Sequence, residues 1–525
     1  MVNANMIYTN IYTFFQQISG NKSNLLLTEN KFLEFLIKLK ANMKHSSFYY
    51  NYSLDYLRFL FKMTAIVRDK QFGYGLRDVY YTLIYCWYIH YPELAFNLIR
   101  HNFKYSISSW NDGKYFCSFI KNKTHNDNHE LINFVINEMM VQLKVDFSNL
   151  TLDPQKLSLL AKWIPREKSK YSWIFYKCAK LYFPYYIKED LYPIQLVKAK
   201  RKCWSKFRKV CSTINAILDP IENIQCNSNN TEFKKINRLT GYNLVKYHKW
   251  VNKNVEMMQQ NGIFENINLN QSKNDIFHKI IKLALEYVSL SSFNKDKEDY
   301  INNIWELINK TIEPLIDVLP IVESSIDMDE NSLYKALGIA ILIAEKTNIG
   351  NRIIISNINY FMINLEKCDN LVDKIKKIEP YLFRINSNLS ETYKSICEIM
   401  HSDDESKQII NNVNILILSN LKNVTNKTKN CDNFLSQSFS FNKKSIKTIF
   451  WVFDGWEKNE CAENISIINI GNIEMINYLW RKKNGSLPTI LTSDILFLKY
   501  ITKIMENEKI KMLDEYIIKY FCLTI

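Results

Sequence analysis

The side chains best suited to chemistry in this chain are the cations and aromatic rings that alternate between Ala161 and Val210. This segment holds fourteen basic side chains against three acidic ones, a net charge of +11 out of +15 for the whole chain. Cations neutralise phosphates, and flat rings stack on unpaired bases. The composition therefore predicts a surface for single-stranded or looped RNA.

Two simpler interpretations of the same residues stay open. Aromatic residues at helical spacing are also typical of a hydrophobic core, with lysines on the solvated face of the same helices. Asn, Ile, Lys and Tyr are abundant while Gly (11) and Pro (10) are scarce, and an AT-rich genome also produces this bias. The charge alone indicates a polyanionic partner, either nucleic acid or an acidic membrane surface.

No catalytic constellation stands out in the sequence. The 11 cysteines are scattered without a Cys-x-x-Cys pair, which favours reduced, buried thiols over a zinc or redox site. His248, His278 and His401 lack a recognisable triad context. No Gly-x-x-x-x-Gly-Lys loop occurs. We therefore expect a protein that is not an enzyme and that takes no small-molecule substrate.

The elements that must position these residues are mostly helices. From about Leu25 to Ile308 the pattern is helical, with few Gly or Pro residues to interrupt it. One helix face is predicted by apolar residues at positions i, i+3, i+4, i+7, i+8 and i+11. These are Ile132, Val135, Ile136, Met139, Met140 and Leu143. Many such helices in succession predict a mainly α protein that begins with a HEAT-like helical repeat array.

Short apolar runs replace the helical pattern in the C-terminal part. They are Pro314–Val322, Arg352–Ser356, Val413–Ser419, Thr448–Asp454 and Ile465–Ile470. Apolar runs of strand length that alternate with helices predict a mainly parallel, doubly wound α/β sheet. Ligands of such sheets bind at the carboxyl ends of the strands.

The chain length supports two domains. Single cores stop growing at about 250–300 residues, and this chain has 525. We predict a helical domain over residues 1–308 and an α/β domain over residues 309–525. The most apolar stretch, Val79–Ile89, is shorter than the roughly 20 residues of a membrane-spanning helix. With no visible signal peptide, we expect an intracellular, cytoplasmic protein with no membrane partner.

Four sequence runs resemble the helical module of the telomerase, Ro and vault (TROVE) family, in the version carried by proteins of large nucleocytoplasmic DNA viruses. The runs are KMTAIVRDKQFGYGLRD (Lys62–Asp78), SWNDGKYFCSFI (Ser109–Ile120), LSLLAKWIPREKSKYSW (Leu157–Trp173) and KFRKVCSTINAILDPIENIQC (Lys206–Cys226). The order and spacing of the runs fit the family, and the C-terminal part resembles a von Willebrand A-like domain. The resemblance implies a ring of helices that holds RNA ends and helices through basic residues, closed by the A-like domain.

Carried over by motif, the resemblance implies a set of phosphate contacts. The residues are Arg68, Arg77, Lys114, Lys162, Arg166, Lys168, Lys170, Arg208 and Lys209. They supply the positive charge that an RNA backbone needs, whereas the sequence of the RNA would be read by other groups.

The A-like resemblance also implies a metal site, in degenerate form. Such domains hold Mg²⁺ or Ca²⁺ through an Asp-x-Ser-x-Ser motif after the first strand, together with a Thr and an Asp from later loops. The matching residues are Glu323, Ser325, Asp327, Ser390 and Asn420. Glu lengthens the ligand arm and Asn removes a charge, which octahedral Mg²⁺ tolerates poorly. We therefore expect the site to be vestigial and the protein to need no cofactor.

The resulting hypothesis is a non-enzymatic, RNA-binding ribonucleoprotein component that resembles the Ro autoantigen. Protein partners would dock on the A-like domain. The alternative is a protein-protein interaction adaptor, or a structural protein of a viral particle or factory, for which RNA would be incidental.

Overall fold

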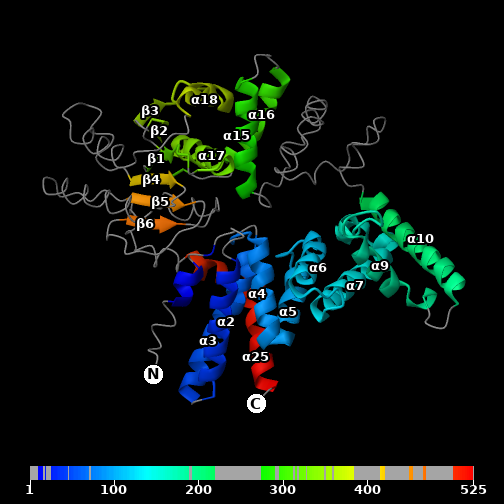
Figure 1. Cartoon of the computed structure of the whole chain (residues 1–525). Helices are drawn as coiled ribbons and strands as arrows, with labels where there is room; N and C mark the ends of the chain where they lie inside the picture. The colour runs from blue at the N-terminus through cyan, green and yellow to red at the C-terminus, as the bar shows by residue number, and fades with distance from the viewer. Residues whose placement is uncertain are drawn as a thin grey trace, which may run out of the picture. The chain divides into compact units, whose positions relative to one another are not determined.

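The computed structural model is mainly helical, with a six-stranded mixed sheet in the C-terminal half of the chain (Figure 1). Two compact units make up the chain. The helical unit comprises Leu25–Asp69, Leu76–Glu232 and Glu508–Ile525, and the sheet unit comprises Met1–Asn24, Lys70–Gly75 and Phe233–Asn507. The structure describes residues 10–15, 18, 25–44, 47–69, 72–187, 192–218, 273–289, 295–310, 314–315, 318–326, 328–347, 350–357, 360–382, 414–419, 448–452, 465–468 and 500–523.

The helical unit is built from helices that pack on their neighbours in the sequence. They are α2 (Leu25–Asn42), α3 (Ser47–Arg68), α4 (Arg77–His90), α5 (Pro92–Lys104), α6 (Trp110–Thr124), α7 (Glu130–Leu152), η2 (Pro154–Lys156), α8 (Leu160–Trp163), α9 (Ser172–Tyr182), η3 (Pro184–Tyr186), α10 (Pro193–Leu218), α24 (Glu508–Lys511) and α25 (Leu513–Leu523). Helix α4 packs against α2, α3 and α5, and α7 packs against α6 and α9. Within the described ranges, no helix combines the length and the apolar character that crossing a membrane requires.

Helix α7 shows how the sequence forms this unit. Ile132, Val135, Met139 and Leu143 recur at helical spacing and are completely buried, so the predicted apolar face is confirmed. Gly113 of α6 lies against this face. A Cβ atom at Gly113 would come within 2.8 Å of Met139 Sδ. A glycine at this position therefore allows α6 and α7 to approach closely.

The C-terminal helices complete the helical unit. Helix α25 packs against α3 and α5, and Figure 1 shows it beside them. Asp514 forms ion pairs with Arg58 (3.2 Å) and Lys62. The His101 Nε2 atom on α5 lies 2.6 Å from the Lys509 carbonyl oxygen on α24. Segments more than 400 positions apart in the sequence thus share one core.

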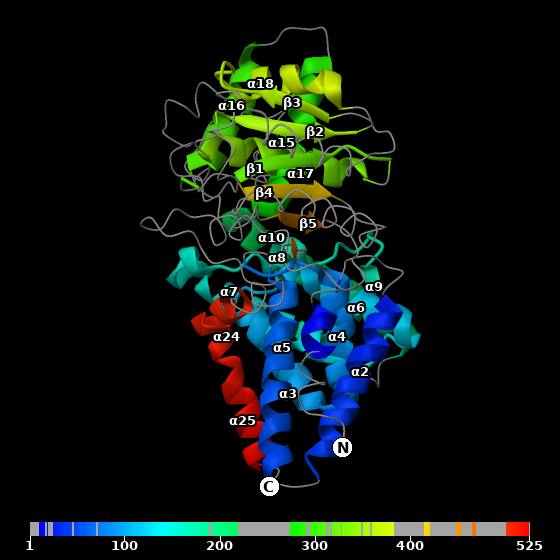
Figure 2. The same ribbon diagram turned by 90° about the vertical axis from the view of Figure 1, so that its left-hand side faces the viewer.

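The sheet has the strand order β3-β2-β1-β4-β5-β6, and Figure 2 shows this order from β3 to β5. The strands are β1 (Val318–Glu323), β2 (Arg352–Ser356), β3 (Tyr360–Asn364), β4 (Asn414–Ser419), β5 (Thr448–Val452) and β6 (Ile465–Ile468). Strand β3 pairs antiparallel with β2, and the other neighbours are parallel. Each parallel strand overlaps a predicted apolar run, and β1 extends one residue beyond its run, to Glu323, whereas β3 was not predicted. Strand β3 stands at the edge of the sheet, with Met362 exposed, and its residues Tyr360–Ile363 form a short apolar run.

The described helices of the sheet unit form two layers beside the sheet. They are α15 (Lys273–Ser289), α16 (Lys295–Lys310), α17 (Glu330–Lys346), α18 (Leu371–Ile378) and η7 (Glu379–Tyr381). Helix α17 packs on β1, while α15 packs on α17 and α18. A buried ion pair between Lys374 and Glu345 (2.6 Å) joins α18 to α17. Trp305 Nε1 on α16 also donates to Glu345 (2.9 Å), so one carboxylate holds three helices together.

Candidate nucleic-acid interface

A row of alternating cations and aromatic rings crosses three helices of the helical unit. The Arg77 guanidinium at the start of α4 lies 4.4 Å from the ring centroid of Tyr115 on α6. Lys114 Nζ lies 5.0 Å from the Tyr115 centroid and 5.0 Å from the Trp163 centroid at the end of α8. Lys162 Nζ lies 5.2 Å from the same Trp163 ring. We call these five residues the cation-aromatic row.

Two further residues extend the row beyond α8. The ring of Tyr171 meets the ring of Tyr115 edge to face, with centroids 5.8 Å apart. Lys170 Nζ lies 5.8 Å from the Tyr171 centroid. The structure thus brings together four of the predicted phosphate contacts, namely Arg77, Lys114, Lys162 and Lys170, with aromatic rings between them.

Local sequence signals fix the elements that carry the row. Helix α6 begins with a capping box, in which the Ser109 backbone N–H donates to the Asp112 carboxylate at 2.9 Å. This cap sets the first turn of α6, which presents Lys114 and Tyr115. After α8, Ile164 and Pro165 are buried and anchor the chain. Proline lacks a backbone N–H and cannot continue the helix hydrogen bonds, so α8 ends before Pro165.

Lys114 sits between two rings and is partly removed from water. Burial lowers the pKa of Lys114 below its usual value of 10.5. A nearby anion favours the charged form of a lysine and raises its pKa again. An anion close to Lys114 would therefore oppose the effect of burial on its pKa.

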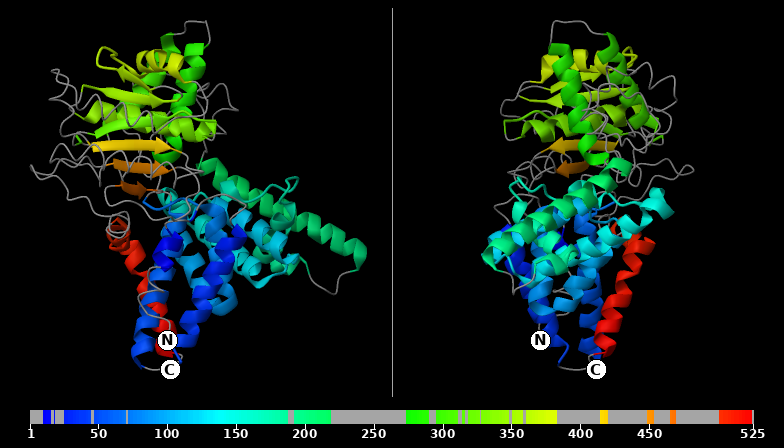
Figure 3. Two further views of the ribbon diagram at one scale, coloured as in Figure 1. Left: turned by 60° about the vertical axis from the view of Figure 1, so that its left-hand side comes forward. Right: turned by 90° about the vertical axis from the view of Figure 1, so that its right-hand side faces the viewer.

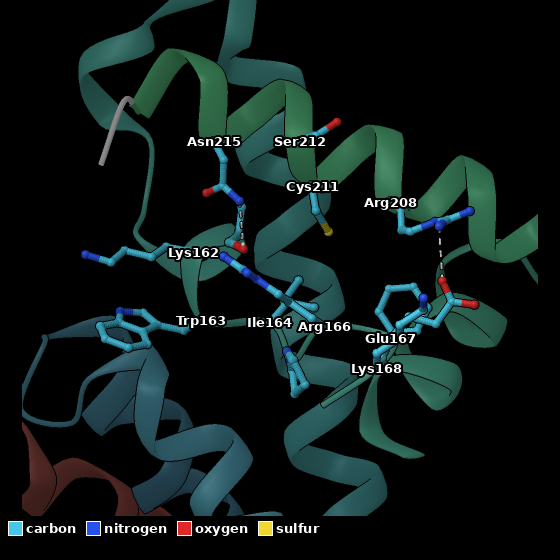
Figure 4. Close-up of a pocket in the computed structure, with 13 residues that line it drawn as sticks. Lys162, Trp163, Ile164, Arg166, Glu167, Lys168, Arg208, Cys211, Ser212 and Asn215 are labelled. Atoms are coloured by element: carbon cyan, nitrogen blue, oxygen red, sulfur yellow. Dashed lines mark hydrogen bonds and ion pairs between the residues drawn. The ribbon is translucent and has the colours of Figure 1, made fainter. Parts of the chain in front are cut away.

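A cavity of about 710 Å³ lies beneath α10, beside Lys162 and Trp163 of the row (Figure 4). Its interior includes the buried side chains of Ile164 and Phe175. In Figure 4 the Arg166 side chain extends beneath α10 in the direction of Asn215. The cavity therefore combines an apolar interior with polar and charged groups at its edge.

The charged groups around the cavity are mostly cations. The lining contains four cations and one acid, a net charge of +3. They are Lys162, Arg166, Lys168, Arg208 and Glu167. Arg208 pairs with Glu167 at 3.2 Å, and such partly exposed pairs contribute only ~0–1 kcal/mol. Arg166 and Lys168 are exposed and form no side-chain ion pair within the described ranges. Both can therefore accept an anionic ligand without breaking an existing contact.

Arg68 does not belong to this surface. Its side chain is 1% exposed and pairs with the buried Asp112 through Nη2 (2.6 Å) and Nε (3.0 Å). The Tyr81 hydroxyl also donates to Asp112, at 3.2 Å. The prediction of Arg68 as a phosphate contact is therefore corrected, because this guanidinium joins the end of α3 to the start of α6 in the interior. The sequence could not reveal this, since Asp112 lies 44 positions away.

Lys209 stands on the exposed side of α10 and does not line the cavity. Helix α10 carries seven basic residues and no acidic one. Figure 3 shows it as a long helix, and it packs against the shorter helices α8 and α9. Its buried residues, among them Cys203, Phe207 and Ile214, leave the cations on the opposite side in contact with water.

Two residues of the site were missed by the sequence analysis. Tyr115 joins Arg77 to Lys114, and Asn215 contributes to the cavity from α10. A usable signal for Asn215 exists in its position seven residues after Arg208, which places both on one helix face. Tyr115 carried no such signal, because its partner Arg77 belongs to another helix.

The predicted metal ligands lie at the carboxyl end of β1 or outside the described residues. Glu323 is buried, and the Ser419 hydroxyl at the end of β4 donates to its carboxylate. The Ser325 hydroxyl is buried without a hydrogen-bond partner in the described part of the chain. The other predicted ligands, Asp327, Ser390 and Asn420, lie outside the described residues.

These donors fall short of what the metal requires. Mg²⁺ takes about six oxygen ligands in near-ideal octahedral geometry. The described residues provide one carboxylate, already hydrogen-bonded to Ser419, and one hydroxyl at Ser325. Across the described ranges, no group of three or more His, Cys, Asp or Glu side chains could hold a metal. The vestigial metal site therefore stays a prediction, and we assign no chemistry to a metal.

No protein-family model matches the chain, and no curated protein matches its sequence. Functional inference therefore depends on the residues and contacts described above.

Proposed function

We propose that this protein is a non-enzymatic ribonucleoprotein component whose helical unit binds RNA through the cation-aromatic row and the cavity beside it. The observation that carries the proposal is the row itself. Arg77, Lys114 and Lys162 alternate with Tyr115 and Trp163 at cation-to-centroid distances between 4.4 and 5.2 Å.

The physical requirements of RNA support this choice of ligand. Phosphate contacts supply most of the affinity, and aromatic rings stack on unpaired bases, which makes single-stranded or looped RNA the favoured form. Glu167 is the single acidic residue between residues 154 and 187, and α10 has none. A polyanion therefore meets little repulsion along this surface.

The proposed architecture follows the family resemblance. The helical unit would be a TROVE-like module of HEAT-like repeats, and the sheet unit a von Willebrand A-like domain that docks protein partners. The strand order β3-β2-β1-β4-β5-β6 supports the second part, because it is the order of a doubly wound fold. The run Glu323-Ser324-Ser325 at the carboxyl end of β1 supports it too.

The experiment is RNA binding as a function of salt for a triple variant in which Lys162, Arg166 and Lys168 are replaced by Ala. For single strands the logarithm of the binding constant falls with the logarithm of salt by about 0.7 per neutralised phosphate. Removing three contacts should therefore flatten the slope by about two. A looped RNA can be titrated by fluorescence anisotropy between about 50 and 200 mM salt.

A matched control removes three exposed lysines of the same unit on or next to α2, namely Lys31, Lys38 and Lys44. This variant loses the same net charge, so it separates local phosphate contacts from a general electrostatic attraction. We expect it to keep the slope of the unchanged protein. Equal slopes for both variants would remove the assignment of RNA to this surface.

One observation favours a second candidate, the protein-protein adaptor. Val141, Val145 and Leu152 of α7 share one helix face and are 53%, 45% and 79% exposed. Exposed apolar stripes of this kind often mark protein-protein contacts. If partners remain attached to the purified protein after nuclease treatment and no RNA is retained, the adaptor function is favoured.

A further inference from the structure

The cavity beneath α10 has the size and the lining of a ligand pocket. Its volume of about 710 Å³ lies within the roughly 300–1,000 Å³ that is usual for pockets holding small organic groups. The side chains of Ala161, Ile164 and Phe175 make part of its wall apolar, and each is buried. Phosphate contacts on a surface need no such cavity, so its presence calls for a ligand with an apolar part.

Asn215 supplies a hydrogen-bond acceptor to which no group among the described residues donates. Its Nδ2 donates to the Ala161 carbonyl oxygen at 3.2 Å, which fixes the orientation of the amide. Its Oδ1 is buried and receives no hydrogen bond within the described part of the chain. A buried acceptor left without a donor is costly, so a ligand that brings an N–H group gains affinity here.

The cations at the rim of the cavity, Arg166, Lys168 and Arg208, supply positive charge for an anionic group of the ligand. Arg166 and Lys168 are exposed, while the partly exposed Arg208 pairs with Glu167 at 3.2 Å. Guanidinium groups bind phosphate in two-pronged fashion, and a lysine adds a point charge. The ligand must therefore combine an anionic group with an N–H donor on a flat, largely apolar body. A bare phosphate lacks the second feature, and a nucleotide has both.

We propose that this cavity takes one unpaired nucleotide of the bound RNA, with the base against Ile164, Phe175 and Asn215 and the phosphate at the rim. This inference deepens the proposed function and rests on it, because the same cations serve both. A free nucleotide has the same chemistry, so the test must separate the two sources.

The test compares three RNA hairpins with the same stem, at one salt concentration. One is fully paired, one carries a single unpaired adenosine, and one carries an abasic residue at that position. The unchanged protein should bind the adenosine hairpin about tenfold more tightly than the other two, which is within the range for one inserted base. Asn215→Leu should abolish this preference, because the base then loses its hydrogen-bond acceptor.

Two further variants keep the result interpretable. Asn133 lies outside the cavity, and its Nδ2 donates to the Asn128 carbonyl oxygen at 3.0 Å. Asn133→Leu removes this similar hydrogen bond and should retain the preference for the adenosine hairpin. Cys211→Met leaves every cation in place but fills part of the cavity with a larger side chain. It should therefore reduce the preference for the adenosine hairpin. Thermal unfolding of each variant shows whether the helical unit stays folded.

Adenosine monophosphate as a competitor identifies the source of the nucleotide. Failure to displace the adenosine hairpin at millimolar concentration supports a nucleotide within RNA, whereas displacement at micromolar concentration supports the cavity but assigns it to free nucleotide. Equal affinity for all three hairpins, with the salt dependence intact, overturns this inference and leaves the proposed function standing. Absence of binding to every hairpin overturns both.

Discussion

Replacing Arg68 by Met tests whether this cation belongs to the core or to the RNA surface. Arg68 donates two hydrogen bonds to one oxygen of Asp112, at 2.6 and 3.0 Å, and both side chains are almost completely buried. Met fills a similar volume but leaves the Asp112 carboxylate without its counter-charge. Breaking a buried pair from one side costs ~3–5 kcal/mol. We expect a loss of this size in the free energy of unfolding of the helical unit.

The assay is urea unfolding followed by circular dichroism at a wavelength dominated by helices. Two units need not unfold together, so the transition of the helical unit is fitted separately. Lys38→Met is the matched control, because it breaks an exposed pair with Glu34 and should cost only ~0–1 kcal/mol. Below the unfolding transition, the Arg68→Met protein should keep its RNA affinity. Unchanged stability together with weakened RNA binding would refute the structural role of Arg68.

Two further predictions concern stability. Burial lowers the pKa of His101 below its usual value of 6.5, so its contribution to stability is present above that pH and is lost as the pH falls below it. The urea midpoint of the helical unit should fall between about pH 7.5 and about pH 5.5, and His101→Gln should reduce this fall; equal falls would contradict the role of His101. Gly338→Leu should destabilise the sheet unit by ~1–3 kcal/mol, because even a Cβ atom added at Gly338 would lie 3.0 Å from the Phe277 side chain. Calorimetry of the two transitions checks this, and a shift confined to the helical unit would contradict it.

The helices and the parallel strands could be predicted because their signals are local. The apolar face of α7 and the continuous runs of β1 and β4 follow directly from residue spacing and burial. Strand β3 was missed although Tyr360–Ile363 is a short apolar run; the strand lies at a sheet edge, with Met362 exposed. The packing of α25 against α3 was also beyond prediction. The contact between Arg58 and Asp514 spans 456 positions and leaves no local pattern.

The candidate site was predictable in composition but not in geometry. Lys162, Arg166 and Lys168 stand out as a local excess of charge and line one cavity in the structure. Arg68 carries the same charge, yet a partner 44 positions away removes it from the surface. The free acceptor of Asn215 is equally invisible in the sequence, because it depends on which hydrogen bond the amide already makes.

The most direct measurement of RNA contact is ultraviolet cross-linking of a looped RNA to the full-length protein, with the cross-linked residues located by mass spectrometry. Aromatic rings that stack on bases cross-link efficiently, so we expect the adducts at Tyr115, Trp163 and Tyr171. The triple variant at Lys162, Arg166 and Lys168 should lose them. Adducts confined to residues outside the cation-aromatic row and the cavity would contradict RNA binding at this surface.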